Sequence, residues 1–403
     1  MSRPGSGSFG VARQIEIYQR GSQVPVAPEA LEQRARELLS PNAFGYLAGG
    51  AGSEDTMRAN LAAFRRWRIE PRVLCNLARR EWQSTLLGTP LPAPVLLAPV
   101  GVQGILHPEG ELASARAAAG LGIPVILSSA SSVTLEDVAA AMGDAPRWFQ
   151  LYWSADPDVA ASFVARAERA GYGAIVVTVD CPILAWRERD LANAYTPFLH
   201  GDGVANYLSD PAFCAKLPSS PAEDPAAAIR RFVEVFGNAT LSWNDLAGLR
   251  GRTNLPLVVK GILSPDDAAR AVDVGMDAIV VSNHGGRQVD GAVASLEALP
   301  RVVERVADRV PVLLDSGIRR GADALKALAL GASAVLLGRL YAWGLAVGGE
   351  AGVREVLLNF LADFDLTLGL SGCACLSDLR PDLLRLETGG SGREREGTGG
   401  KLR

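Results

Sequence analysis

Short apolar runs alternate with alanine-rich amphipathic stretches along most of the chain, starting near residue 94. The runs have the length and β-branched content of buried parallel strands, whereas the stretches between them have helical spacing and often end in glycine. Eight such runs occur, at residues 94–100, 124–129, 147–153, 174–180, 256–262, 278–284, 310–317 and 334–339. Eight strand–helix units over about 250 residues predict an α/β fold, a (β/α)8 TIM barrel. A doubly wound parallel sheet is the alternative.

The segments outside this alternation predict extensions of the barrel. Residues 28–40 have helical periodicity and predict an N-terminal helical extension, and the glycine-rich segment 44–52 around Tyr46 predicts a tight turn. The polar, glycine-rich ends at residues 1–12 and 389–403 are expected to be disordered. Residues 13–388 are therefore expected to form a single domain.

One long insertion interrupts the regular spacing after the fourth predicted strand. It covers residues 190–240, and its part from residue 197 to 227 is rich in Pro, Gly, Asp and Ser. Because it leaves the barrel on the side where active sites form, it predicts a lid over the barrel mouth. A loop that contacts another subunit explains it equally well.

Composition excludes several classes of partner. A net charge of −4 with 21% charged residues gives no basic surface for nucleic acid or for a membrane. The sequence has no signal peptide and no apolar run of the roughly 18 residues that a membrane helix requires. The five cysteines are odd in number and irregularly spaced, which predicts reduced thiols, a cytoplasmic protein and no metal site, although Cys373 and Cys375 are close in sequence.

His284 is the strongest candidate for a catalytic base. The chain has three histidines, and only His284 stands at the end of a predicted barrel strand, where barrel enzymes present their catalytic groups. A histidine in a polar turn is the ordinary alternative. The Gly285-Gly286-Arg287 sequence that follows favours the functional interpretation.

Polar side chains stand at nearly every predicted strand end, which indicates a large polar ligand over the barrel mouth. The first strand ends instead in the small residues Pro99, Val100 and Gly101, next to which a flat ligand could lie. The polar candidates are Ser128, Gln150, Tyr152, Thr178, Asp180, Arg187, Lys260, Ser282, His284, Arg287, Asp315, Arg319 and Arg339.

The last two predicted strands indicate a phosphate group on this ligand. The motifs DSGIRRG (315–321) and LLGR (336–339) combine glycines with arginines where barrels usually bind phosphate. Lys260 would place a positive charge beside a ring that gains negative charge, although it could instead form a structural ion pair. FMN has both features, a phosphate group and a ring that gains negative charge. A dinucleotide is not indicated, because no G-x-G-x-x-G motif follows the first strand.

Together these motifs resemble a known family. SNHGGRQ (282–288), TVD-x-P (178–182), FQLY (149–152), the Lys260-Gly261 pair and DSGIRRG are similar to motifs of the FMN-dependent 2-hydroxy acid oxidases and dehydrogenases, from about residue 14 to about residue 380. Within that family EIYQRG, GYLAGGAGSEDT, ANYLSDPAF, WRERDL and YAWG most resemble the lactate 2-monooxygenases.

The resemblance implies a role for each matching residue. His284 would take a proton from carbon or oxygen of the 2-hydroxy acid, and Asp180 would pair with the resulting imidazolium. Arg287 would hold the substrate carboxylate with Tyr46 and Tyr152, and Arg187 would be a second cation. Lys260 would stabilise reduced FMN. The residues implied to bind FMN are Pro99, Val100, Gly101, Ser128, Gln150, Thr178, Lys260, Ser282, Asp315, Ser316, Gly317, Arg319, Gly338 and Arg339.

The implied reaction converts L-lactate and O2 to acetate, CO2 and water in a homo-oligomer of four or eight subunits. The alternatives are an oxidase that releases a 2-oxo acid and H2O2, or a dehydrogenase with another electron acceptor. A barrel isomerase or aldolase and a non-catalytic flavin-binding protein are more distant alternatives.

Four departures from the family pattern bear on this choice. Ser316 replaces a glycine of many relatives, although the monooxygenase pattern also has Ser there. Gln288-Val289-Asp290 follows the oxidases more than the monooxygenases, and Cys181-Pro182 also differs from the monooxygenase pattern. Ala130 stands where glycolate oxidase has tryptophan, which leaves room for a substrate side chain larger than that of glycolate.

Overall fold

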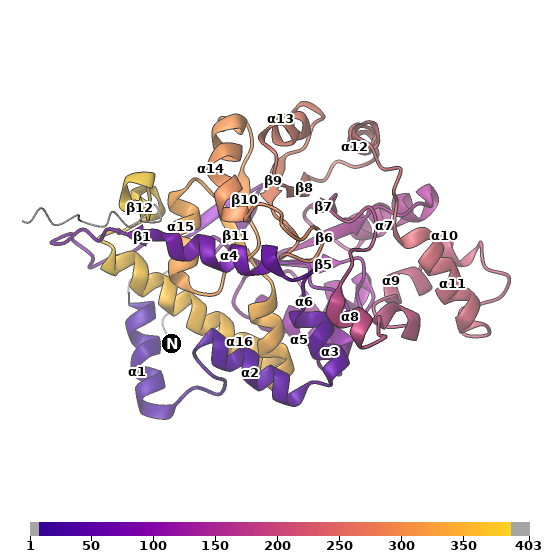
Figure 1. Cartoon of the computed structure of the whole chain (residues 1–403), viewed down its shortest axis with the longest axis horizontal. Helices are drawn as coiled ribbons and strands as arrows, with labels where there is room; N and C mark the ends of the chain where they lie inside the picture. The colour runs from indigo at the N-terminus through magenta and orange to yellow at the C-terminus, as the bar shows by residue number, and fades with distance from the viewer. Residues whose placement is uncertain (1–7, 388–403) are drawn as a thin grey trace, which may run out of the picture.

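The computed structural model describes residues 8–387, and its centre is a closed barrel of eight parallel strands (Figure 1). The predicted barrel is confirmed, and each predicted apolar run supplies one strand. In barrel order the strands are β10 (Val312–Leu314), β11 (Ala334–Leu337), β4 (Val95–Leu97), β5 (Val125–Ser128), β6 (Arg147–Tyr152), β7 (Ile175–Thr178), β8 (Leu257–Ile262) and β9 (Ala278–Val281).

Alternate residues of these strands form two separate apolar clusters, as the two-residue period of a strand requires. One set fills the barrel interior, including Trp148 of β6 and Leu336 of β11, together with Leu86 and Leu91. The last two belong to the antiparallel strands β2 (Ser84–Leu86) and β3 (Thr89–Leu91). The other set packs outward against the helices. The interior is therefore solid, and a ligand site must lie at a barrel mouth.

The outer layer consists of helices that follow the strands in sequence. Ser264 and Thr134 cap two of them by accepting hydrogen bonds from backbone N–H groups. The last helix of the layer is kinked at Gly348 and Gly349. The layer contains α5 (Gly110–Ala119), α6 (Leu135–Met142), α7 (Pro157–Arg169), α13 (Pro265–Asp273), α14 (Ser295–Val306), α15 (Gly321–Ala329) and α16 (Arg339–Leu370).

The N-terminal extension is helical, and two expectations for it are wrong. The first helix begins at Phe9, inside the segment 1–12 that was expected to be disordered; residues 1–7 lie outside the described chain. Phe9 is buried against Trp82, and the Gly10 N–H donates to Asp365, so tertiary contacts order this helix. The segment 44–52 was expected to be a turn, but its first half is helical because Ser40 caps a helix that starts with Pro41. The four helices are α1 (Phe9–Arg20), α2 (Pro28–Leu38), α3 (Pro41–Ala48) and α4 (Asp55–Arg66).

The insertion packs as a helical wall on one end of the molecule (Figure 1). Its helices are α8 (Glu188–Ala192), α9 (Ala205–Leu208), α10 (Pro211–Cys214) and α11 (Pro225–Phe236), and α12 (Trp243–Leu249) follows. Asp210 is fully buried and accepts hydrogen bonds from Arg166 Nη1 at 3.1 Å and from Ser162 Oγ at 2.7 Å, both on α7. Buried ion pairs and hydrogen bonds therefore fix this part of the insertion to the barrel.

The last features are a small two-stranded sheet and the outcomes of the remaining predictions. The strands β1 (Trp67–Ile69) and β12 (Leu384–Leu386) pair far from the insertion (Figure 1). None of the helices in the described chain is both long and apolar enough to cross a membrane. The five cysteines are free. The tail 389–403 lies outside the described residues.

Candidate active site

The carboxyl ends of the barrel strands open into a cavity of about 600 Å³. Most of the predicted site residues line it: Tyr46, Pro99, Val100, Gly101, Ser128, Tyr152, Arg187, Lys260, His284, Arg287, Asp315, Gly338 and Arg339. The remaining predicted residues do not line it: Gln150, Thr178, Asp180, Ser282, Ser316, Gly317 and Arg319. Several of these bind the lining residues from behind, as the following contacts show.

A chain of neutral polar groups crosses the ends of β5, β6 and β7. The Gln150 side-chain amide donates to Thr178 Oγ1 at 3.0 Å, and its Oε1 accepts from Ser128 Oγ at 3.1 Å and from Ser129 N at 3.2 Å. All of these side chains are buried. The amide is thus held in one orientation, as recognition of a heteroaromatic ring edge requires.

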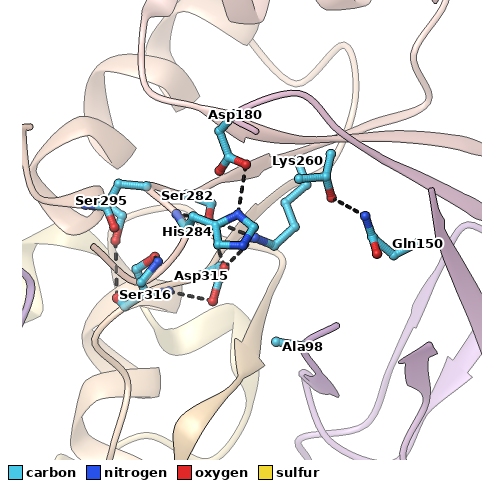
Figure 2. Close-up of polar contacts among 12 residues, drawn as sticks. Ala98, Gln150, Asp180, Lys260, Ser282, His284, Ser295, Asp315 and Ser316 are labelled. Carbon is cyan, nitrogen blue, oxygen red and sulfur yellow. Dashed lines mark hydrogen bonds and ion pairs between the residues drawn. The ribbon is translucent and has the colours of Figure 1, made fainter. Parts of the chain in front are cut away.

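Lys260 is a buried cation at the end of β8, and it is held by two neighbouring strands (Figure 2). Its Nζ lies 2.8 Å from Asp315 Oδ2 and donates to Ser282 Oγ at 3.0 Å. Burial opposes its charge, but Asp315 and Asp180 outweigh burial and raise the pKa of Lys260. The ammonium group is therefore charged at neutral pH, and it faces the cavity.

His284 stands at the end of β9 between two functional side chains. Its Nδ1 lies 2.8 Å from Asp180 Oδ1, and its Nε2 lies 3.3 Å from the Tyr152 hydroxyl. The backbone at His284 has φ of 58°, and its N–H donates to Ser282 Oγ at 3.0 Å. Close approach of Asp180 also requires Gly261, where φ is +112° and a Cβ would lie 2.7 Å from Asp180 Cγ.

The protonation states of this pair suit a base. Burial lowers the pKa of His284, and this effect exceeds the opposite influence of Asp180. Burial raises the pKa of the Asp180 carboxyl, but His284 and Lys260 outweigh it, so its pKa is below the usual range. A neutral imidazole therefore lies beside an ionised carboxylate, ready to accept a proton at Nε2. Burial also raises the pKa of Tyr152, which stays a hydrogen-bond donor.

Arginines without carboxylate partners surround the rest of the cavity. Arg287 Nη1 donates to the carbonyls of Tyr46 and Gly49, both at 2.7 Å, and Arg339 donates to the carbonyls of Leu47, Gly285 and Gly49. Within residues 8–387, neither forms an ion pair with Asp or Glu. Burial and neighbouring arginines lower the pKa of Arg287 to about 10 and that of Arg339 below its usual range. Both cations would be stabilised by a bound anion.

The other predicted residues support these groups from behind. Ser316 has φ of 83°, and its Oγ accepts from Gly285 N at 2.9 Å. Gly317 has φ of 91° beside Asn60 on α4. Arg319 lies with its guanidinium 4.9 Å from the centroid of the Trp343 ring, outside the cavity lining.

Sequence reasoning missed the apolar wall of the cavity. It comes from the loop after β7 and from the insertion, and its members are Ile183, Leu184, Phe198, Leu199, Phe232, Val233 and Phe236. Phe232 and Phe236, four residues apart on one helix, were a signal that these side chains share a face.

Gln288 was not among the predicted site residues, but its side chain connects the loop after β7 to the site. Its amide donates to the carbonyls of Asp180 at 2.9 Å and Ile183 at 3.2 Å. Its Oε1 accepts from Arg187 at 3.1 Å.

The residues present fit FMN. A flat ring can lie against the end of β4, where Gly101 is so close to β5 that a Cβ would meet the Ala130 carbonyl at 2.6 Å. The fixed Gln150 amide and charged Lys260 suit the ring, and Arg339 suits a phosphate. The donor set therefore matches the ligand that the sequence predicted.

Comparisons with known proteins agree with this fit. The profile of the FMN-dependent dehydrogenase family matches residues 35–386. An L-lactate oxidase of Lysinibacillus sphaericus is 45% identical over 88% of this chain and 92% of its own length. The human 2-hydroxyacid oxidase 1 is 40% identical over 88% of this chain and 95% of its own. A crystal structure of mandelate oxidase superposes with a TM-score of 0.80 at 40% identity, covering 90% of this chain and 99% of that one.

Proposed function

The chain belongs to the FMN-dependent dehydrogenase family and is an FMN-dependent oxidoreductase of 2-hydroxy acids; from this membership we propose that it oxidises an L-2-hydroxy acid with an apolar side chain, L-lactate or a larger homologue, with O2 as the electron acceptor. The observation that carries the proposal is the position of an apolar wall next to the His284–Arg287 pair in one cavity.

His284 is the proposed base. Its neutral imidazole accepts the substrate proton at Nε2, and Asp180, 2.8 Å from Nδ1, stabilises the imidazolium that forms. FMN, when bound, would supply the acceptor for the two electrons of the oxidation. Lys260, whose ammonium group Asp315 and Ser282 hold in place, would stabilise the negative charge that the ring gains.

Arg287 is the proposed carboxylate anchor. Only its Nη1 is used by backbone carbonyls in the described chain, which leaves the N–H groups on Nη2 and Nε for a carboxylate. The Tyr46 ring lies 5.1 Å from the guanidinium and restricts its orientation. A substrate held there presents its hydroxyl-bearing carbon to His284 and Tyr152, which line the same cavity.

The apolar wall supports an apolar substrate side chain. Ala130 adds only a methyl group beside the end of β4, and Phe198 and Phe236 close the cavity on the insertion side. A hydroxymethyl or charged side chain would lose hydration there without gaining a partner.

The fate of the product is the finer part of the proposal. The resemblance to lactate 2-monooxygenases supports a reaction in which pyruvate stays in the site and reacts with H2O2 to give acetate, CO2 and water. The ion pair between Asp210 and Arg166 fixes the insertion, which carries part of the apolar wall, to the barrel. A fixed insertion favours retention of pyruvate in the cavity. The relatives named lactate oxidase and 2-hydroxyacid oxidase favour the alternative, release of the 2-oxo acid and H2O2.

Product analysis tests both parts. The purified yellow protein is mixed with L-lactate in air, and the products are identified by NMR together with an assay for H2O2. Acetate without free H2O2 supports monooxygenation, whereas pyruvate with an equal amount of H2O2 refutes it and leaves an oxidase. No turnover of L-lactate or of longer L-2-hydroxy acids, with glycolate consumed, would contradict the proposed substrate class.

A further inference from the structure

Cys181 adds a third metal-ligating atom to the His284–Asp180 pair. Its Sγ lies 3.2 Å from Asp180 Oδ1 and 3.2 Å from His284 Nδ1, and these two atoms are themselves 2.8 Å apart. Within residues 8–387 this is the only group of three His, Cys, Asp or Glu residues whose ligand atoms all lie within 4.8 Å of one another. The catalytic proposal uses the histidine and the aspartate but assigns no task to the thiol.

The three atoms form a triangle close to one face of a tetrahedral zinc site. Zinc bonds of about 2.0 to 2.3 Å to nitrogen, oxygen and sulfur place neighbouring ligand atoms about 3.4 to 3.6 Å apart. The two separations of 3.2 Å that involve sulfur need to widen by about 0.2 to 0.4 Å, and the 2.8 Å between Nδ1 and Oδ1 by about 0.6 Å.

Charge and access also suit a divalent cation. Burial and Asp180 raise the pKa of the Cys181 thiol, so a binding Zn²⁺ has to displace its proton; the thiolate formed and the ionised carboxylate would then together neutralise the ion, and a neutral imidazole completes the set. The second carboxylate oxygen, Oδ2 of Asp180, is buried without a hydrogen-bond partner in the described chain. Cys181 and His284 line the cavity, so an ion and a fourth ligand from solvent can reach them. Lys260 opposes a nearby cation, but Asp315 already pairs with it.

We propose that Asp180, Cys181 and His284 form a binding site for a thiophilic divalent cation such as Zn²⁺, and that the bound cation inhibits the enzyme. When the ion binds Nδ1, the ring hydrogen that His284 shares with Asp180 moves to Nε2 and the thiol proton of Cys181 is released to solvent, so Nε2 can no longer accept the substrate proton. Binding is independent of the proposed function, whereas inhibition rests on the assignment of His284 as the base.

Binding is measured first, without turnover. The FMN-loaded protein is freed of metal with a chelator, and Zn²⁺ is then titrated in competition with a chromophoric chelator. We expect one Zn²⁺ per chain, with affinity reduced more than about 10-fold in Cys181→Ser because a first ligand is lost. Cys214→Ser is the matched control, since this half-buried thiol donates to the Leu208 carbonyl in the insertion and should not alter binding.

A second measurement uses only the wild-type chain, in case the Cys181 variant does not fold. Zn²⁺ should slow alkylation of Cys181, read by peptide mass spectrometry, and leave the exposed Cys75 equally reactive. Absence of stoichiometric binding, or equal protection of both thiols, would overturn the site.

Inhibition is measured last, as the rate of anaerobic flavin bleaching by L-lactate at increasing Zn²⁺. The expected result is a loss of bleaching that follows occupancy of the site and is reversed by chelator. Bound Zn²⁺ with unchanged bleaching would contradict the inhibitory role. A protein that binds Zn²⁺ but bleaches with no 2-hydroxy acid even in the absence of metal would instead contradict the proposed function.

Discussion

His284 holds its imidazole at the barrel mouth in a backbone conformation that few non-glycine residues adopt, with φ of 58°. Ser316, which supports the same loop, also has a positive φ, of 83°. Hydrogen bonds hold these two backbone conformations in place: His284 N donates to Ser282 Oγ, and Gly285 N donates to Ser316 Oγ. Strained backbone of this kind is maintained where the position of a side chain matters for function.

The variant His284→Ala tests the catalytic role of His284 separately from the binding of FMN. In His284→Ala the cavity and the Lys260–Asp315 pair stay intact, so FMN should remain bound. Flavin bleaching by L-lactate should slow by about 10²- to 10⁴-fold, the usual contribution of a general base. Anaerobic stopped-flow absorbance measures the rate, and the flavin-to-protein ratio is the control. Bleaching at the wild-type rate would remove His284 from the mechanism.

At the scale of elements, a buried carboxyl joins helix α5 to two strand-end loops. Glu111 Oε1 accepts from Gln103 N at 3.0 Å and from Ser132 N at 3.1 Å, while Oε2 has no partner in the described chain. Burial raises the pKa of Glu111 above its usual value. Because the folded-state pKa is raised, its contribution to stability is complete below the unfolded pKa, about 4.3, and is lost as pH rises through the folded value.

Glu111→Gln should therefore remove the pH dependence of folding stability that ionisation of Glu111 causes. The amide keeps an oxygen for both N–H groups but cannot ionise, so the variant should gain stability relative to the wild type as pH rises from about 4.3, the unfolded-state pKa, to neutral. Thermal unfolding midpoints of both proteins over this range measure it. Glu111→Ala is the control, since it loses the acceptor and should be destabilised at every pH. A constant difference between Gln and wild type would contradict the burial argument.

The insertion is the second element whose anchoring can be tested. Asp210→Ala leaves Arg166 without one buried carboxylate partner and removes the cap of α10, which should lower stability by about 3–5 kcal/mol. Limited proteolysis should then cut the insertion before the barrel. Asp224→Ala removes another aspartate cap, that of α11, without a buried ion pair, and should cost only about 1 kcal/mol. Equal effects of the two changes would show that the ion pair does not anchor the insertion.

At the scale of the whole molecule, large apolar side chains remain exposed near the cavity mouth. Trp186, Ile183 and Leu199 are 71%, 68% and 61% exposed, and the last two line the cavity. Clustered exposed apolar residues mark contact surfaces, and the family resemblance implies subunits in fours or eights. Both functions considered for the insertion, a cover and a subunit contact, are compatible with this position.

We therefore expect a homotetramer or homo-octamer in solution. Size-exclusion chromatography with light scattering measures the mass of the particle. Trp186→Glu should dissociate it, because a charge would be buried in the contact, whereas Tyr18→Glu, a 79% exposed residue on α1, is the control. A wild-type monomer would contradict the expected assembly, and an intact oligomer in Trp186→Glu would place the contact elsewhere.

Sequence by itself determined the barrel, its cofactor and the family. Eight apolar runs of strand length separated by helical stretches favour a parallel barrel over a doubly wound sheet, and the closed barrel of the structure bears this out. His284, Lys260 and Arg287 were found because strand ends are adjacent in sequence to strands that are easy to recognise. The polar strand ends and the glycine–arginine motifs indicated FMN, the resemblance supported it, and the family match bears it out. The residue roles and the monooxygenase reaction stay predictions.

Tertiary structure alone decided which distant residues meet. It ordered Phe9 by packing it on Trp82, made a wall of Phe198 and Phe236, and brought Cys181 to 3.2 Å from His284, 103 residues later in the chain. Contacts of this kind depend on side-chain packing between elements, which leaves no local periodicity in the sequence. A helix or strand can be recognised from its neighbours in the chain, but a cavity is formed by residues that only the closed barrel places together.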